Sequence, residues 1–181
     1  MANGTDDAQL VEECRRGDLR AFEVLVYRYQ KPVFNVVYRM VRDREDARDL
    51  TQGTFLKAFQ QLGSFDPRFK FYSWIYRIAI NESLNHVKRA GRQEPLEDDR
   101  ASAGPGPDED LAGLEMRRQV QDAVMTVKPD HRIVLVLRHF LDCSYQDIAE
   151  ILGVPEKTVK SRLFSARQEL RSVLEGRGVL R

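Results

Sequence analysis

Polar and cationic side chains gather between residues 157 and 171, and their spacing separates them from apolar ones. At 100° per residue of an α-helix, one narrow apolar stripe contains Val159, Leu163, Ala166 and Leu170. The rest of that helix carries Lys, Arg, Ser, Gln and one Phe. Lys and Arg can bond guanine or phosphate, and Ser and Gln can bond base edges. A helix that served only for packing would need no more than the apolar stripe. The additional basic and polar side chains therefore favour DNA binding over a helical hairpin with a solvated basic face.

The residues just before this segment predict a helix-turn-helix. Ser144 can cap a first helix, with Asp147 as a weak second half of a capping box. Gly153 suits the turn because a positive φ is cheap there, and Pro155 suits the first turn of the second helix. In this motif the second helix enters the major groove and reads base edges from its N-terminal part. The expected buried side of the first helix is Ile148, Ile151 and Leu152.

A second informative segment, residues 65–89, mixes aromatic rings with basic residues. This mixture suits single-stranded nucleic acid, since cations follow the backbone and rings stack on exposed bases. However, aromatic side chains in a small helical domain usually fill its core. For each ring considered by itself, a place in the core is therefore favoured over contact with a base. The aromatic residues are Phe65, Phe69, Phe71, Tyr72, Trp74 and Tyr76.

One helical face of this segment is polar along its length. The residues on it are Arg77, Asn81, Asn85 and Lys88, spaced four, four and three apart, with Trp74 at the N-terminal end. Asn offers both a donor and an acceptor, as needed to hold the edge of a base. The alternative is a merely solvated face.

The net charge of +1 hides an uneven distribution. Residues 1–90 hold 15 basic and 12 acidic side chains, residues 91–112 hold 2 and 7, and residues 113–181 hold 12 and 9. Neither basic part is charged enough to suggest strong independent DNA binding, which indicates DNA contact made with the help of a partner.

The sequence gives little support to other classes of protein, such as disulfide-rich, metal-binding, membrane or enzymatic ones. Cys14 and Cys143 form no disulfide framework or zinc spacing, and His139 with Cys143 gives only two metal ligands. The chain shows no signal peptide and no apolar run near the ~20 residues that span a bilayer, so a soluble, reducing, intracellular setting is expected. Without a glycine-rich phosphate loop or a nucleophile elbow, we expect no enzyme, catalytic residue, metal, cofactor or small-molecule substrate.

The helical periodicity predicts an all-α fold of two small helical domains, 1–90 and 111–181. They are joined by a flexible acidic linker, 91–110, which cannot bury enough apolar surface to fold alone. In the first domain we expect helices at 6–16, from the Asp18 cap to about 40, at 44–61 and at 71–89. Pro32 should kink or divide the second of these. The second domain should hold four helices, near 110–127, 130–141, 145–152 and 156–174.

Taken together, these segments resemble the extracytoplasmic-function (ECF) group of sigma-70 family RNA polymerase sigma factors. The matching runs are GDLRAFEVLVYRYQKPVFNVVYRMV, DREDARDLTQGTFLKAF, FYSWIYRIAINESLN and SYQDIAEILGVPEKTVKSRLFSARQEL, in the family's order. The resemblance implies a bacterial cytoplasmic factor that binds core RNA polymerase, at the β′ clamp helices and the β flap, and directs it to promoter DNA. It also implies an anti-sigma partner, often membrane-attached, that would hold the chain at the inner membrane face.

The resemblance also implies a role for each part. The first domain would recognise and melt the −10 element, with a pocket for a flipped base, and Asn81 is its principal candidate. The −10 candidates are Phe65, Arg68, Lys70, Phe71, Tyr72, Trp74, Arg77, Asn81, Asn85 and Lys88. The −35 candidates, for duplex DNA, are Lys157, Thr158, Lys160, Ser161, Arg162, Phe164, Ser165 and Gln168. The candidates for docking on core polymerase are Asp46, Asp49, Leu50, Gln52, Phe55 and Leu56.

One residue departs from the family pattern: Gly53 stands where the family usually has Glu. This removes a charge and costs ~1 kcal/mol of helix propensity. The main alternative is a stand-alone helix-turn-helix regulator, which would footprint duplex DNA without polymerase but leaves the aromatic segment and the docking helix without a role. An inhibitor of another sigma factor would lack the basic recognition face.

Overall fold

The computed structural model describes residues 6–90 and 111–179, and every regular element within them is helical. The N-terminal half contains α1 (Asp7–Arg15), α2 (Leu19–Val41), α3 (Arg44–Gln61), the short 3-10 helix η1 (Leu62–Ser64) and α4 (Phe71–Ala90). The C-terminal half contains α5 (Leu111–Thr126), α6 (Pro129–His139), α7 (Tyr145–Leu152) and α8 (Glu156–Gly176). The predicted all-α fold is confirmed, while the predicted linker lies outside the described residues.

Short polar side chains start the helices where the sequence predicts. Asp43 caps α3 by accepting a hydrogen bond from the Asp46 amide at 2.8 Å. Ser144 and Asp147 form the complete capping box of α7, with side-chain to amide distances of 3.0 and 3.1 Å. Gly153 then ends α7 at φ 65°, where a residue with a Cβ would be strained. These local bonds fix the geometry of the helix-turn-helix.

One predicted detail is wrong, and two others hold in part. Pro155 precedes α8 instead of lying in its first turn, with φ −59° and ψ 146°. Pro32 does not divide α2, because the helix runs unbroken and its neighbours Val33 and Val36 are buried in the core, while a kink at Pro32 stays a prediction. Leu152 packs against the core as predicted, but it is only half-buried because it lies at the end of α7 beside the turn.

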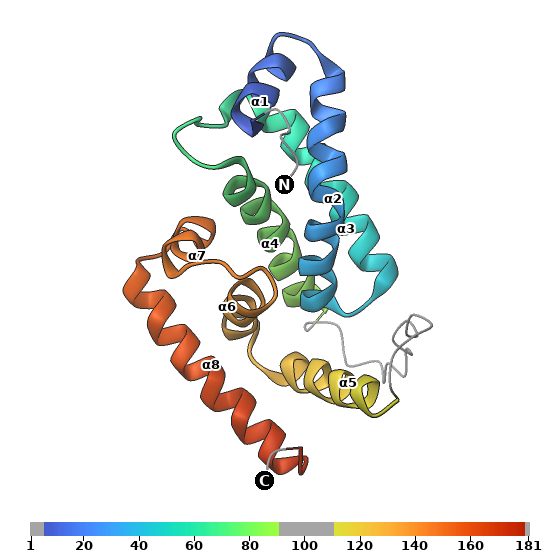
Figure 1. Ribbon diagram of the computed structural model, residues 1–181, viewed down its shortest axis with the longest axis vertical. Helices are drawn as coiled ribbons and strands as arrows, with labels where there is room; N and C mark the ends of the chain where they lie inside the picture. Colours follow the sequence, from blue (N-terminus) through green and yellow to red (C-terminus); the bar gives the residue numbers. More distant parts are fainter. Residues whose placement is uncertain (1–5, 91–110, 180–181) are drawn as a thin grey trace.

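The two halves pack against each other. In the N-terminal half α2, α3 and α4 pack pairwise and α1 lies on α2, while in the C-terminal half α8 packs on α5, α6 and α7. Figure 1 shows α6 and α7 beside α4 and α2, and their contacts agree. One continuous core crosses the boundary, with Leu25, Met40, Ile75 and Ile80 from one half and Ile133, Leu137, Ile148 and Leu163 from the other.

Arg132, near the start of α6, ties the halves together. It is only 5% exposed, and burial lowers the pKa of its guanidinium. The guanidinium donates to the carbonyl oxygens of Met40 at 2.6 Å, Met125 at 2.5 Å and Val127 at 3.2 Å. Close by, Arg42 at the end of α2 forms an ion pair with Asp122 of α5. Because buried cations need such partners, this contact specifies how the halves meet.

Candidate nucleic-acid interfaces

The outer face of α8 presents polar and aromatic side chains to solvent. Its apolar stripe packs on the neighbouring helices, with Val159, Leu163 and Ala166 buried and Leu170 half-buried, and this fixes the rotation of the helix. Phe164 is 67% exposed, so packing does not require this ring. Of the −35 candidates, the structure exposes Lys157, Lys160, Ser161, Phe164 and Gln168 and half-buries Thr158, Arg162 and Ser165.

One cation on this face already has an acidic partner. Lys160 Nζ lies 2.8 Å from Glu156 Oε1, one turn earlier on α8. This hydrogen bond raises the pKa of Lys160, so the side chain stays charged. Both groups are exposed, and such pairs contribute little net stability, so a DNA phosphate could replace Glu156 at small cost.

The rings of the aromatic segment divide between core and surface. Phe65 and Phe71 are buried, and with half-buried Trp74 they form a cluster whose centroids lie 5.2 to 5.9 Å apart. Phe69, in contrast, is 51% exposed. The Phe69 ring lies near this cluster and is more available to a base than the rings of Phe65, Phe71 or Trp74. It is not among the −10 candidates predicted from the sequence. Its place in the loop between two cations, outside any helical repeat, is the signal that could have identified it.

A pocket of about 200 Å³ opens beside these rings. Aromatic walls with a few polar groups suit a planar ligand with hydrogen-bonding edges. Glu150 contributes from α7, whereas the other lining residues belong to the N-terminal half. Those residues are Ser64, Phe65, Asp66, Phe69, Ser73, Trp74 and Arg77.

The polar stripe predicted from the helical wheel is present on α4. Arg77, Asn81, Asn85 and Lys88 are all exposed along it or at its edge. Arg77 lines the pocket, whereas Asn81 lies one turn further on, about 6 Å along the axis, and is outside the lining. Neither Asn81 nor Asn85 makes a side-chain hydrogen bond within the part of the chain that the structure describes. Their amide groups are therefore available to a ligand.

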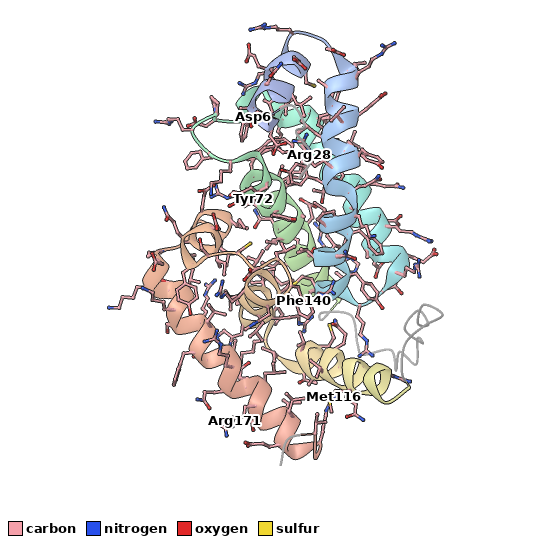
Figure 2. All side chains as sticks on the ribbon, in the orientation of Figure 1. Asp6, Arg28, Tyr72, Met116, Phe140 and Arg171 are labelled. Carbon is pink, nitrogen blue, oxygen red and sulfur yellow. The ribbon has the colours of Figure 1, made fainter. Side chains whose placement is uncertain are left out.

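Two other −10 candidates reach across to α7. Lys70 Nζ lies 3.1 Å from Asp147 Oδ1, and the Tyr72 hydroxyl donates to the same oxygen. Figure 2 shows Tyr72 where α4 faces α7. Hydrogen bonds, chiefly from Ser144 and then from Tyr72, hold the pKa of Asp147 far below its usual range. Burial, followed by the bond to Asp147, raises the pKa of Tyr72. The remaining loop cation, Arg68, bonds Asp66 at 2.9 Å.

The exposed face of α3 combines acidic and apolar residues. Of the six docking candidates it presents Asp49, Gln52 and Leu56. Leu56 is 60% exposed, and Phe59, one turn further on, is exposed as well. Phe59 is absent from the predicted set, although its spacing of three from Leu56 places both on one face.

The other three docking candidates contribute to the fold. Phe55 is buried in the core, and Leu50 is half-buried against it. Asp46 Oδ2 lies 3.1 Å from Nε2 of His86, which joins α3 to α4. A partner would therefore meet mainly the exposed ridge.

We expect Gly53→Ala to raise the free energy of unfolding by about 1 kcal/mol, because glycine keeps more backbone freedom in the unfolded chain. Gly53 lies inside α3, and a Cβ built there would meet no atom within 4 Å. Urea unfolding followed by circular dichroism measures the change. Gly17, at φ 102°, is the matched control, where alanine should lower stability. If Gly53→Ala lowered the stability, Gly53 would not lie in a helix with free space around its Cα.

The cysteines are buried, unpaired thiols. Burial raises the pKa of Cys143 to about 11 and also raises that of Cys14, so neither is a ready thiolate near neutral pH. Within residues 6–90 and 111–179, no three His, Cys, Asp or Glu side chains group as a metal site. None of the helices described there is long and apolar enough to cross a membrane.

Two family models match the chain. Sigma-70 region 2 matches residues 25–93, and Sigma-70, region 4, matches residues 117–170. Both belong to one class of protein, the sigma-70 transcription initiation factors, which are not enzymes. The first match includes both the aromatic segment and α3, which a stand-alone helix-turn-helix regulator would leave unexplained.

Relatives that cover nearly the whole chain identify a group within this class. The RNA polymerase sigma-H factor of Pseudomonas aeruginosa is 36% identical over 97% of both chains. The ECF RNA polymerase sigma-E factor of Haemophilus influenzae is 35% identical over 97% of this chain and 98% of its own. The structure of CnrH in complex with the cytosolic domain of CnrY overlays with a TM-score of 0.72 at 27% identity, covering 94% of this chain and 97% of CnrH. This chain belongs to the ECF group of the sigma-70 family.

Proposed function

We propose that this chain directs core RNA polymerase to promoters through two different DNA surfaces. In this proposal residues 1–90 form the −10 domain, residues 111–181 form the −35 domain, and residues 91–110 link them. The observation that carries the proposal is the pair of separate exposed polar faces, one on α8 and one on α4. Each face is more polar than packing requires, and each belongs to a different family match.

The α8 face is proposed to read the −35 element as duplex DNA. With α8 in the major groove, Lys157, Lys160 and Ser161 lie in its N-terminal part, where base edges are read. Phe164 is exposed on the same helix, and its ring could meet a thymine methyl group. Arg162 is half-buried at the edge of the face, so a phosphate is its expected partner.

The α4 face and the loop before it are proposed to hold the unpaired −10 strand. Extruding a base costs a few kcal/mol of stacking, which the protein must offset by stacking and edge hydrogen bonds. Phe69 and Trp74 provide rings beside the pocket, and Asn81 provides both donor and acceptor. Arg77 and Lys88 would follow the strand's phosphates. Recognition of the −10 element is thereby coupled to strand opening.

Polymerase docking is proposed at the exposed ridge of α3. Asp49 supplies charge and Leu56 and Phe59 supply apolar surface, which fits a basic helical partner such as the β′ clamp helices. A second contact, with the β flap, is proposed at an apolar groove of about 520 Å³ between α5, α6 and α8. Leu135, Leu170 and Leu174 are among its lining residues, and it adjoins the C-terminal half of α8 rather than the part proposed to read bases.

The proposal also includes an anti-sigma partner and a cytoplasmic location. If that partner is membrane-attached, the chain would be held at the inner membrane face. The support is indirect: the family resemblance, together with CnrH, which has been solved bound to the cytosolic domain of another protein.

In vitro transcription with core polymerase on genomic fragments tests the proposed function. We expect defined transcripts only when chain and core are both present. The purified chain alone should leave no strong duplex footprint, because neither half is strongly basic. If the chain neither associates with core nor starts any transcript, the proposal fails.

A further inference from the structure

The first residue of α8, Glu156, is an acid on a face that otherwise suits DNA. It directly precedes Lys157, Lys160 and Ser161, which are proposed to read base edges, and its own side chain is 47% exposed. A carboxylate beside DNA is repelled by the phosphates and loses its water unless a donor replaces it. The helix dipole favours an acid at this end, but the effect at an exposed site is weak. A donor on a base edge would supply what this carboxylate lacks.

Glu156 holds a cation beside it. Lys160 Nζ lies 2.8 Å from Glu156 Oε1, one turn further along α8. The same nitrogen lies 5.9 Å from the centre of the Tyr145 ring on α7, at the distance of a weak cation–π contact. Both contacts draw the ammonium group toward the N-terminal end of α8. This end of the helix therefore presents a hydrogen-bond acceptor and a donor side by side.

A depression of about 400 Å³ opens beside Glu156, where the end of α6 meets the starts of α7 and α8. Its lining residues are Arg138, Ser144, Tyr145, Gln146 and Glu156. Arg138 is engaged elsewhere, because it bonds the Cys143 carbonyl oxygen at 2.8 Å and pairs with Asp142 at 3.5 Å. Within the described part of the chain, the Glu156 carboxylate therefore has Lys160 as its ion-pair partner and space beside it for a base edge.

Among the four base pairs, C·G fits this pair of groups. In the major groove cytosine presents its N4 amino group as a donor, and the paired guanine presents O6 and N7 as acceptors. Adenine also has an amino group, but its N7 acceptor lies beside it and would repel a carboxylate. The cytosine amino group and guanine O6 are themselves joined by a base-pair hydrogen bond, so they lie roughly 2.9 Å apart. This spacing matches the 2.8 Å between Glu156 and Lys160.

We propose that Glu156 and Lys160 read one C·G base pair of the −35 element as a unit. The carboxylate accepts a hydrogen bond from the cytosine amino group, and the ammonium group donates to the guanine. Lys160 keeps Glu156 as its partner on the DNA and does not exchange it for a phosphate. The inference rests on the proposed function of α8, to which it adds a preference for one base pair.

The test uses holoenzyme, reconstituted from the full chain and core polymerase, on a promoter that this holoenzyme transcribes. Each base pair of the upstream duplex element is replaced in turn by the other three, and the transcript yield measures the preference at each position. The variants are Glu156→Ala, Glu156→Gln and Lys160→Ala. Glu12→Ala is the matched control, because Glu12 is exposed on α1 and pairs with Arg16 one turn away at 3.2 Å. Thermal melting checks that each variant folds.

We expect the natural chain to prefer C·G at one position of the element. Glu156→Ala should reduce the preference at that position alone by roughly tenfold, because it removes the acceptor for cytosine. Glu156→Gln should shift the preference toward adenine, since an amide can accept from N6 and donate to N7. Lys160→Ala should reduce the preference for C·G at the same position. Glu12→Ala should leave every preference unchanged.

Three outcomes would overturn the inference and leave the proposed function standing. If Glu156→Ala changed no preference, or if the natural chain preferred C·G nowhere, the carboxylate would contact no cytosine. If Glu156→Ala raised transcription equally from every sequence, the carboxylate would only repel phosphates. If the Glu156 and Lys160 variants changed different positions, the two side chains would not share a base pair. If instead the natural chain and core started no transcript, the proposed function itself would fail.

Discussion

Replacing Leu56 by arginine is expected to lower the affinity of the chain for core RNA polymerase at least about tenfold. Leu56 is 60% exposed on the ridge of α3, and its burial by a partner contributes roughly 1.5–3 kcal/mol. Arginine would keep little of that contact and would place a cation opposite a basic partner. Titrating fluorescently labelled chain with core polymerase measures the change.

Leu19→Arg provides the matched control. Leu19 is 59% exposed at the start of α2, outside the proposed docking helix, so the two substitutions alter equally exposed leucines. Neither should move the melting temperature by more than a few degrees, because neither side chain belongs to the core. If both variants lost polymerase affinity equally, the contact would not be specific to α3. If neither did, the proposed docking face would be wrong.

The sequence predicts those features that local chemistry decides. The capping box of Ser144 and Asp147 depends on residues three apart, and both of its bonds are present. The apolar stripe of α8 follows from helical periodicity, and Val159 and Leu163 are buried as the wheel requires. A side-chain pattern and a helix cap need no knowledge of the rest of the chain, which is why these predictions were accurate.

The features decided by distant contacts could not be predicted in this way. Phe65 and Phe69 lie in the same loop, yet one is buried in a ring cluster and the other is exposed, depending on how the loop crosses α4. Arg132 reaches a carbonyl oxygen 92 residues away. The hydrogen bond from Tyr72 to Asp147 is also long-range. The sequence explains each residue without the other, Tyr72 as a ring of the aromatic segment and Asp147 as half of the capping box. No periodicity in the sequence records these pairings.

Asn81→Ala is expected to slow promoter opening roughly tenfold to a hundredfold while leaving polymerase binding intact. An amide that bonds a base edge with both donor and acceptor is worth about 1–3 kcal/mol, and alanine removes it without altering the helix. Asn81 is exposed on α4, so the fold should lose nothing. Permanganate reactivity of unpaired thymines in the promoter, followed over time, measures the rate of opening.

Two further asparagines make the result specific. Asn35→Ala, at an exposed position of α2, should leave opening unchanged, because Asn35 lies outside both DNA faces. Asn85→Ala, one turn beyond Asn81 on the same stripe, should have a smaller effect, because it lies further from the rings at Trp74. If Asn81→Ala opened promoters normally and Asn85→Ala did not, the base would be held one turn further along α4 than proposed. Normal opening by both would mean that the stripe is only a solvated surface, and the flipped base would have to be held by the loop alone.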